Sequence, residues 1–460
     1  MPGASPRRPS TSAGVWVTTS NSPSGSGSNV KTHINRERRV VVTGMGIVAP
    51  NGIGLKDFWN NTLEGRSGIF EVDRFPLDGL KSRIAGLVKD FRPRELGLRE
   101  EQIRRLDRYA QFALAAARMA TGDARLDLQN LDHERMGVCV ANAICGTRFM
   151  EEEFLALTER GTAPLDGAWA QRWLYQGATF NVASAELAHE YKALGPCFTL
   201  STGCTAGLDA IGFSLDRIRS NEADVMICGA SEAPITPIAM GAFDVVGALS
   251  SKRNHVPHQA SRPFEADRDG FVLGEGAGIL VLEERQHALR RNATIYAEVR
   301  GFGSCNNAFH MTDLPPDGHD LARALRAAIE DARILPQEIS YVSAHGSSTR
   351  QNDVNETTAL KEVLGRHAYD IHVSSLKSMV GHPLAAANVL ESISALLALH
   401  TGKLPPTINY DTPDPACDLH YVPNRSIQRK LDVILKEASG FSGIHSALVF
   451  SKPDYVGGLR

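Results

Sequence analysis

Apolar and polar residues follow two periods along this chain, one typical of buried strands and the other of amphipathic helices. Residues 100–121 carry apolar side chains at helical spacing, and the chain after Cys204 continues as a helix through Ile218. Short apolar runs bounded by glycine or proline predict buried strands at residues 39–43, 223–229 and 279–282. Strands that alternate with helices indicate an α/β fold.

The same order of elements returns later in the chain. Residues 295–299 predict a strand, residues 321–332 a helix, and residues 339–343 a strand that leads into His345. This repeats the strand, helix, strand and reactive-residue order that surrounds Cys204. We therefore interpret the chain as an internal duplication, with an N-terminal half over residues 37–290 and a C-terminal half over residues 291–460.

The remaining stretches lack a regular pattern. Residues 1–36 are rich in Ser, Gly, Thr and Pro and hold no acidic residue, which predicts a disordered tail. An organelle transit peptide shares this composition, but no amphipathic arginine pattern is present. The proline-rich residues 231–269 predict a long loop. Gly274, Gly276 and Gly278 resemble a phosphate-binding loop, yet the run enters a strand instead of opening a helix, so we expect no nucleotide site.

Composition narrows the class of protein. The formal net charge is −3, so the global basic field of a nucleic-acid-binding protein is absent. Seven cysteines without a C-x-x-C pair indicate a reducing compartment and argue against a disulfide scaffold or a structural zinc site. No apolar run reaches the length of a membrane span, and no secretory signal is evident. We expect a soluble, cytoplasmic protein.

Cys204 is the first candidate for chemistry. Residues 199–210 predict a strand, a sharp turn and a helix with Cys204 at its start. The unpaired N–H groups and the positive end of the helix dipole favour a thiolate there, so we expect a lowered pKa. Most free cysteines are nevertheless small buried hydrophobes, and the assignment needs support from other residues.

Three further clusters supply that support. His345 leaves a strand into a hydroxyl-rich loop, and His382 precedes Pro383 at the first turn of an apolar helix predicted over residues 384–400. Phe441 lies in a glycine-rich turn before another strand. A single histidine is more often structural than catalytic. Each cluster, however, stands beside glycine at the end of a strand or helix, where functional side chains gather.

Together with the run Arg-Pro-Phe-Glu-Ala-Asp-Arg-Asp-Gly-Phe at residues 262–271, these motifs resemble the β-ketoacyl-acyl-carrier-protein synthases, condensing enzymes of the thiolase fold. The resemblance extends from about Arg38 to the C-terminus. Around Cys204 and His382 the sequence is most similar to ketosynthase subunits of bacterial type II polyketide synthases. It implies a thiolase-like, duplicated fold of five layers, α-β-α-β-α.

The resemblance also implies an activity. An acyltransferase of this kind catalyses the decarboxylative Claisen condensation of an acyl-enzyme thioester with malonyl-acyl carrier protein, in polyketide or fatty-acid-like biosynthesis. Cys204 would hold the acyl chain, and the backbone N–H groups of Cys204 and Phe441 would form the oxyanion hole. His345 and His382 would polarise the malonyl thioester and stabilise the enolate left by loss of CO₂.

Supporting roles follow from the same resemblance. Lys377 and Glu356 would form an ion pair behind the histidines, and Ser347 and Thr349 would hold the pantetheine arm. Phe441 would gate the acyl pocket. The implied partners are an acyl carrier protein, docked by the helix that carries the adjacent arginines at 104 and 105, and a second subunit, in a homodimer or a heterodimer with a chain-length-factor-like chain. No metal or redox cofactor is implied, because phosphopantetheine carries the substrates.

Several positions depart from the family pattern and bear on substrate and gating. Ser347 replaces a threonine, Ser442 a glycine after the gating phenylalanine, and Ile444 and His445 a Thr-Asn pair. Glycines are common where this chain has Ala385 and Asn388.

Two other functions stay open from the sequence. An enzyme could use the Cys204 acyl-enzyme for cyclisation or acyl transfer, although the thiolase version is weak because Cys417 lacks the setting of a second reactive cysteine. A non-catalytic chain-length partner generally lacks the reactive cysteine that this chain has.

Overall fold

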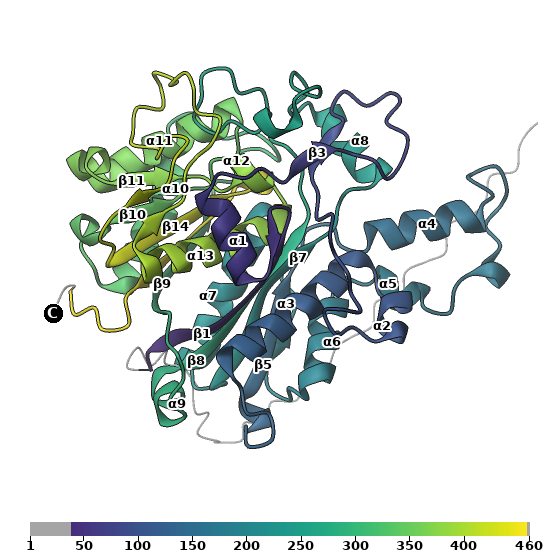
Figure 1. Cartoon of the computed structure of the whole chain (residues 1–460), viewed down its shortest axis with the longest axis horizontal. Helices are drawn as coiled ribbons and strands as arrows, with labels where there is room; N and C mark the ends of the chain where they lie inside the picture. The colour runs from purple at the N-terminus through teal and green to yellow at the C-terminus, as the bar shows by residue number, and fades with distance from the viewer. Residues whose placement is uncertain (1–37, 458–460) are drawn as a thin grey trace, which may run out of the picture. The chain divides into compact units, whose positions relative to one another are not determined.

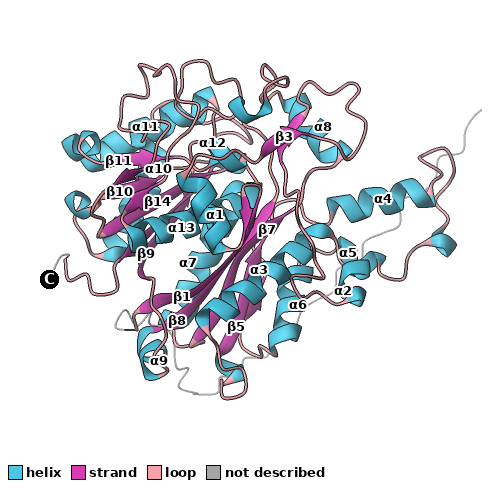
Figure 2. Ribbon diagram, in the orientation of Figure 1, coloured by secondary structure: helices cyan, strands magenta, loops and turns pink. Residues whose placement is uncertain are grey.

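An eleven-stranded sheet runs through residues 38–457, the part of the chain that this computed structural model describes (Figures 1 and 2). The predicted tail at residues 1–36 lies outside the described residues. The strands of the first half are β1 (Val40–Ala49), β2 (Gly52–Ile53), β5 (Met136–Ala141), β6 (Cys197–Phe198), β7 (Val225–Glu232) and β8 (Gly276–Glu284). Those of the second half are β9 (Ala297–Asn306), β10 (Tyr341–Ser343), β11 (His372–Ser374), β14 (Val433–Ser439) and β15 (Ile444–Ser451).

The sheet is built twice around its centre. Its order is β11-β10-β14-β15-β9-β1-β8-β7-β5-β6, with β2 paired to β1. In each half the three outer strands run parallel, while the inner strands are antiparallel. The antiparallel pair β1 and β9 joins the halves. Because strand order and direction repeat, the predicted duplication is confirmed.

Helices form three further layers, which Figure 1 shows on and between the two halves of the sheet. Helices α3 (Arg108–Ala124) and α6 (Val182–Tyr191) cover the first half, and α10 (His319–Ala332) and α11 (Arg350–Leu364) cover the second. Helices α7 (Ala206–Arg219) and α13 (Leu384–Thr401) contact strands of both halves. The result is the thiolase-like α-β-α-β-α fold that the sequence predicts.

Glycines allow the outer helices to approach the central strands in both halves. A Cβ on Gly46 of β1 would lie 1.9 Å from the carbonyl oxygen of Ala116 on α3. In the second half, a Cβ on Gly303 of β9 would lie 2.4 Å from the carbonyl oxygen of Ala324 on α10. No side chain fits at either position, so the same device packs the outer layer twice.

Two predicted elements are wrong in detail. Residues 100–121 form two helices, α2 (Glu100–Arg105) and α3, because Asp107 between them accepts a hydrogen bond from the backbone N–H of Tyr109 and caps α3. The predicted loop at 231–269 contains α8 (Pro237–Val246), which Thr236 caps at its start and Gly247 ends with a φ of 74°. By contrast, the run from Gly274 enters β8, as predicted.

The remaining elements connect these layers. They are α1 (Leu55–Leu63), β3 (Ile69–Glu71), β4 (Ile84–Gly86), α4 (Thr147–Leu157), α5 (Leu174–Ala178), α9 (Arg285–Arg290), α12 (Lys377–Val380), β12 (Lys403–Leu404) and β13 (Ile427–Gln428). Among the described helices only α13 has the length and hydropathy of a membrane span, and 89% of that span is buried inside the fold. The apolar character of α13 is thus explained by its place in the middle layer.

Candidate active site

One cavity of about 250 Å³ brings together the clusters that the sequence singled out. Cys204 enters it from a 3-10 turn, η3 (Gly203–Thr205), that leads directly into α7. His345 follows β10, His382 precedes α13, and Phe441 opens a second 3-10 turn, η7 (Phe441–Gly443), between β14 and β15. Residues from both halves therefore meet at the ends of α7 and α13, at the centre of the molecule.

Burial, and not the helix dipole, governs the Cys204 thiol. Desolvation raises the pKa of Cys204 to about 11, although a hydrogen bond from the backbone N–H of Phe441 and the charge of Lys377 act to lower it. The expected lowering of this pKa is thus wrong for the free protein. The physical reason is that the thiol stands one turn ahead of α7, inside an apolar cavity wall.

Phe441 approaches Cys204 closely through its glycine neighbour. A Cβ on Gly440 would lie 3.3 Å from the backbone nitrogen of Cys204, closer than most side chains come. Gly440 thereby lets the η7 turn bring the N–H of Phe441 to the thiol. Two backbone donors, those of Cys204 and Phe441, thus belong to turns in contact with each other.

The two histidines face each other edge to face, with ring centroids 5.2 Å apart. Both rings are buried, and desolvation together with the positive charge of Lys377 lowers the pKa of each well below its usual value. The ammonium of Lys377 lies 3.3 Å from Nδ1 of His345, which places the ring proton of the neutral imidazole on Nε2. Both imidazoles are therefore neutral at physiological pH.

The partner of Lys377 is a residue that the sequence analysis missed. Its ammonium forms an ion pair at 2.5 Å with Glu391 of α13 and also donates to the backbone carbonyl of His345 at 2.7 Å. The predicted ion pair with Glu356 is wrong, because Glu356 lies on α11 and accepts a hydrogen bond from the backbone N–H of Gly346 at 2.8 Å. Burial and the neighbouring carboxyl of Glu437 raise the pKa of Glu356 well above its usual value.

A sequence signal for Glu391 did exist. It is the single Asp, Glu, Lys or Arg in the predominantly apolar helix α13. A charge at a buried helical position requires a partner, and the lysine before His382 is a ready one.

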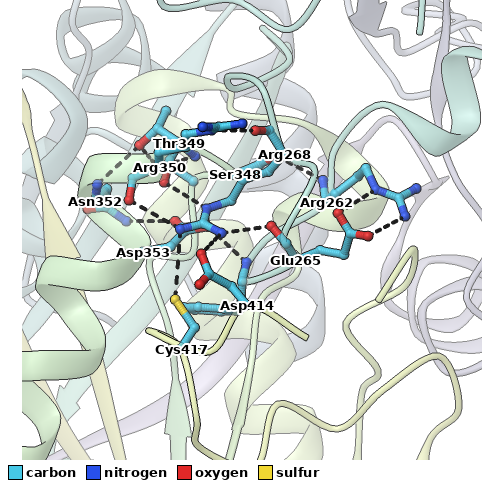
Figure 3. A network of polar contacts seen from close by, with 12 residues as sticks. Arg262, Glu265, Arg268, Ser348, Thr349, Arg350, Asn352, Asp353, Asp414 and Cys417 are labelled. Carbon is cyan, nitrogen blue, oxygen red and sulfur yellow. Dashed lines mark hydrogen bonds and ion pairs between the residues drawn. The ribbon is translucent and has the colours of Figure 1, made fainter. Parts of the chain in front are cut away.

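A buried polar network holds the loop after His345, which carries the hydroxyls of residues 347–349 (Figure 3). Arg268, almost fully buried, forms ion pairs with Asp353 at 3.2 Å and Asp414 at 2.6 Å and donates to the carbonyl of Thr349. The backbone N–H of Arg262 donates to Ser348. These contacts explain why the motif at residues 262–271 accompanies the histidine motif in the sequence.

The hydroxyls of Ser347 and Thr349, in the same loop, line the cavity. The Oγ of Ser347 lies 2.9 Å from Oγ1 of Thr349, and Thr349 also caps α11 by accepting from Asn352. Their orientation is therefore set before any ligand arrives.

The departures around Phe441 have structural consequences. Ser442 takes a left-handed backbone conformation with a φ of 68°, where glycine is favoured, and its N–H donates to the carbonyl of Met311 at 2.7 Å. His445 is buried, hydrogen-bonded to Ser439 at 2.9 Å, and its pKa falls to about 4 through desolvation. Ile444 pairs with Asn306 in the sheet. The turn that carries Phe441 is thus held on both sides.

Ala385 and Asn388, the residues of α13 that depart from the family pattern, lie behind Cys204. The side-chain amide of Asn388 donates a hydrogen bond to the backbone carbonyl of Cys204, while its Oδ1 is buried with no partner among the described residues. One turn earlier, the carbonyl of Ala385 lies only 2.4 Å from where a Cβ on Gly207 would be. These contacts bring α13 and α7 together behind the nucleophile.

The other candidates lie elsewhere. Arg104 is exposed, but Arg105 is buried in α2 and forms an ion pair with Glu186 at 2.6 Å, so it is not available to a docking partner. Cys417 is buried 3.8 Å from Arg268 and does not line the cavity. Within residues 38–457, no group of His, Cys, Asp and Glu side chains has a metal-binding arrangement.

Comparison with known proteins gives this site a family. The N-terminal domain of β-ketoacyl synthases matches residues 37–288, and the C-terminal domain matches residues 296–411. The chain belongs to the β-ketoacyl synthase family. It is 45% identical over 418 residues, 91% of this chain and 98% of the relative, to the tetracenomycin polyketide synthase ketoacyl synthase alpha subunit of Streptomyces glaucescens. A 3-oxoacyl-[acyl-carrier-protein] synthase 2 of Coxiella burnetii is 41% identical over 416 residues, 90% of this chain and 99% of the relative.

Solved structures of β-ketoacyl synthases share the fold. A type II polyketide synthase acyl-carrier protein in complex with its ketosynthase, bound to the hexaketide, contains a chain that is 46% identical and superposes with a TM-score of 0.85, covering 91% of this chain and all of that one. The ishigamide ketosynthase/chain length factor contains one that is 34% identical, with a TM-score of 0.81, covering 90% and 99%. The chain is thus a condensing enzyme of the acyltransferase class.

Proposed function

We propose that this β-ketoacyl synthase elongates a polyketide chain by decarboxylative condensation with malonyl-carrier protein. The observation that supports it most is the convergence of Cys204, His345 and His382 in one cavity of a chain similar to polyketide ketosynthases over nine-tenths of its length. The N-terminal half supplies the nucleophile, and the C-terminal half supplies the histidines. Phosphopantetheine delivers both substrates along the hydroxyls of Ser347 and Thr349.

The first half-reaction is acyl transfer to Cys204. The sulfur attacks the thioester carbonyl and its proton passes to a neutral imidazole. The imidazolium then gives this proton to the sulfur of the phosphopantetheine arm, which leaves as the thiol, and the imidazole is neutral again. The backbone N–H groups of Cys204 and Phe441 stabilise the oxyanion that develops on the carbonyl oxygen.

The second half-reaction is condensation. His345 and His382 donate hydrogen bonds to the carbonyl oxygen of the malonyl thioester, whose carboxylate leaves as CO₂. The enolate carbon then attacks the acyl-Cys204 thioester, the acyl–sulfur bond breaks, and the Cys204 sulfur is released while the β-ketoacyl chain stays on the carrier protein. Each neutral imidazole keeps one ring N–H, with which it can donate such a hydrogen bond.

We further propose that the enzyme works in the cytoplasm with an acyl carrier protein and a second ketosynthase-like subunit. The related solved structures contain such assemblies, and all seven cysteines are free thiols, as in a reducing compartment. Arg104 is retained as a candidate docking residue, whereas Arg105 is not.

A reconstitution tests the proposal. The purified chain, with its co-purified partner subunit where one is present, is supplied with acyl- and malonyl-carrier protein, and the carrier-bound products are analysed by mass spectrometry. We expect a β-ketoacyl product longer by two carbons, with CO₂ release. The same product from the Cys204→Ala variant would contradict the role of Cys204, whereas acyl transfer without chain extension by the wild type would favour cyclisation or simple acyl transfer.

A further inference from the structure

Strand β14 carries two adjacent ionisable residues that the mechanism above does not use. Lys436 and Glu437 are fully buried near the middle of the second half of the sheet, between β10 and β15. Strand interiors of this kind are normally apolar, and burial of a charge is costly unless the charge is paired. Their partners therefore indicate what the two residues do.

Alternation along β14 sends these side chains to opposite faces of the sheet. Ile434 packs in the core around α13, and Leu435 packs in the core beside α11. Lys436 therefore faces α13, and Glu437 faces α11. The pair reaches the histidine loop from two sides.

On the α13 face, Lys436 extends the ion pair of the active site. Its ammonium lies 2.8 Å from Oε2 of Glu391, while Oε1 of Glu391 binds Lys377 at 2.5 Å. Glu391 thus bridges two lysines. Lys377 donates to the carbonyl of His345, and Lys436 lies 3.5 Å from the carbonyl of Ala344, the residue before it.

On the α11 face, Glu437 holds the histidine loop through its backbone. Its Oε1 accepts the N–H of His345, and the next N–H, that of Gly346, donates to Glu356. Burial and the neighbouring carboxyl of Glu437 raise the pKa of Glu356 well above its usual value, so the two carboxyls hold one proton between them. With that proton in place, two ammonium groups balance the carboxylates of Glu391 and Glu437.

We propose that Lys436 and Glu437 are positioning residues for His345: Glu437 fixes the backbone where the imidazole leaves β10, and Lys436 places a second positive charge behind both histidines. This inference rests on the proposed function, in which the two neutral histidines donate hydrogen bonds to the malonyl thioester. Neither side chain lines the cavity, so both act through other residues.

Ionisable side chains from several elements surround the two histidines. Lys377 on α12, Glu391 on α13 and Glu356 on α11 surround them together with the β14 pair. His445 on β15 and the Cys204 thiol complete the set, and burial keeps both of these uncharged near neutral pH. Loss of Lys436 alone leaves an unbalanced carboxylate near the rings, so the proton affinity of both imidazoles rises.

A pH titration of the histidine ring resonances, followed by NMR, tests this proposal in the intact protein. It does so whether or not a variant is active. The signal of His345 is identified by its absence in His345→Ala. Removal of one charge at this depth is expected to move the midpoint by about one pH unit, upward in Lys436→Met and downward in the double variant Glu437→Gln/Glu356→Gln. Both carboxyls are replaced because Glu356 would otherwise ionise and keep the charge of the pair. Lys436→Arg, which keeps the charge, should stay close to the parent. Lys452→Met, which removes a surface charge near the end of β15, is the matched control.

The pH dependence of activity is expected to shift in the same direction as the NMR midpoint. Malonyl-carrier protein decarboxylation by Cys204→Ala isolates the step that depends on the histidines, and its acid limb should follow the NMR midpoint in each variant. Midpoints that coincide with the parent in both Lys436→Met and Glu437→Gln/Glu356→Gln would overturn the inference. If Lys436→Met does not fold, the downward shift in the isosteric Glu437→Gln/Glu356→Gln decides it. Absence of decarboxylation in the Cys204→Ala parent would count against the proposed function, while the NMR midpoints still decide the role of Lys436.

Discussion

At the residue scale, the site pairs a half-buried thiol with two buried imidazoles, and desolvation keeps all three uncharged. Cys204 is consequently not a preformed thiolate. Its proton has to leave as the carbonyl is attacked, and a neutral imidazole in the same cavity is a suitable acceptor. The reactivity of Cys204 toward a simple electrophile should therefore differ from its reactivity toward a bound thioester.

Alkylation by iodoacetamide measures the reactivity of Cys204 toward a simple electrophile. With a pKa of about 11, the thiolate fraction of Cys204 rises about tenfold for each pH unit between 7 and 9, and the alkylation rate should rise with it. Intact-mass kinetics of wild type against Cys204→Ala separates Cys204 from other thiols such as the exposed Cys197. A rate that levels off below pH 8 would show that the thiol is activated after all.

Asn388 should matter for acylation more than for stability. Its amide holds the Cys204 carbonyl, and loss of a hydrogen bond of about 1 kcal/mol corresponds to about a fivefold slower step. We expect Asn388→Ala to acylate about fivefold more slowly in stopped-flow or quenched mass-spectrometric assays. Ser392→Ala, one turn along the same buried face of α13, is the control, and an equal loss in both would mean that the helix is merely loosened.

Sequence reasoning reached the cysteine and histidines because each stands beside glycine at the end of an element. It missed Lys436, Glu437 and Glu391 because short-range patterns do not reveal which buried charges meet across three elements. The predicted ion-pair partner of Lys377 was wrong for the same reason, since the choice between Glu356 and Glu391 depends on how α11 and α13 pack.

At the scale of elements, the fold depends on close contact between glycine-bearing strands and outer helices. Gly46→Ala and Gly303→Ala each force a Cβ into a helix carbonyl, and each should lower the free energy of unfolding by about 3 kcal/mol. Gly241→Ala in α8, where nothing lies within 4 Å of the added Cβ, should instead be neutral or stabilise by about 0.5 kcal/mol. Denaturant titration checks all three, and a tolerated Gly46→Ala would contradict the packing.

The alternating strands and helices were predictable, because their periods are local. The break between α2 and α3 and the presence of α8 were not predicted, although Asp107 and Thr236 are both good N-caps. Capping signals inside an apparently continuous pattern are easy to overlook, because the hydrophobic period continues across them.

At the scale of the whole molecule, the two edges of the sheet differ. The edge strand β11 is covered, since the N–H of Val373 donates to the carbonyl of His420. Within the described residues no strand pairs with the outer side of β6, and Leu194 and Phe198 beside it are 70% and 44% exposed. An uncovered apolar edge of this kind favours pairing with another subunit.

Light scattering tests that edge. The wild type, alone or with its partner subunit, should have the mass of a dimer, and Phe198→Glu should shift it toward the monomer. Phe309→Glu, an exposed phenylalanine in the loop after β9, should leave the mass unchanged. A monomer both with and without the partner would contradict the interface.

The central claim is that Cys204 carries the acyl chain between two half-reactions built from opposite halves of the molecule. Intact-protein mass spectrometry after incubation with acyl-carrier protein tests it most directly. We expect one acyl adduct on the wild type, none on Cys204→Ala, and a persistent adduct on His382→Ala that malonyl-carrier protein fails to discharge. An adduct that survives in Cys204→Ala, or an absence of any adduct on the folded wild type, would contradict the account.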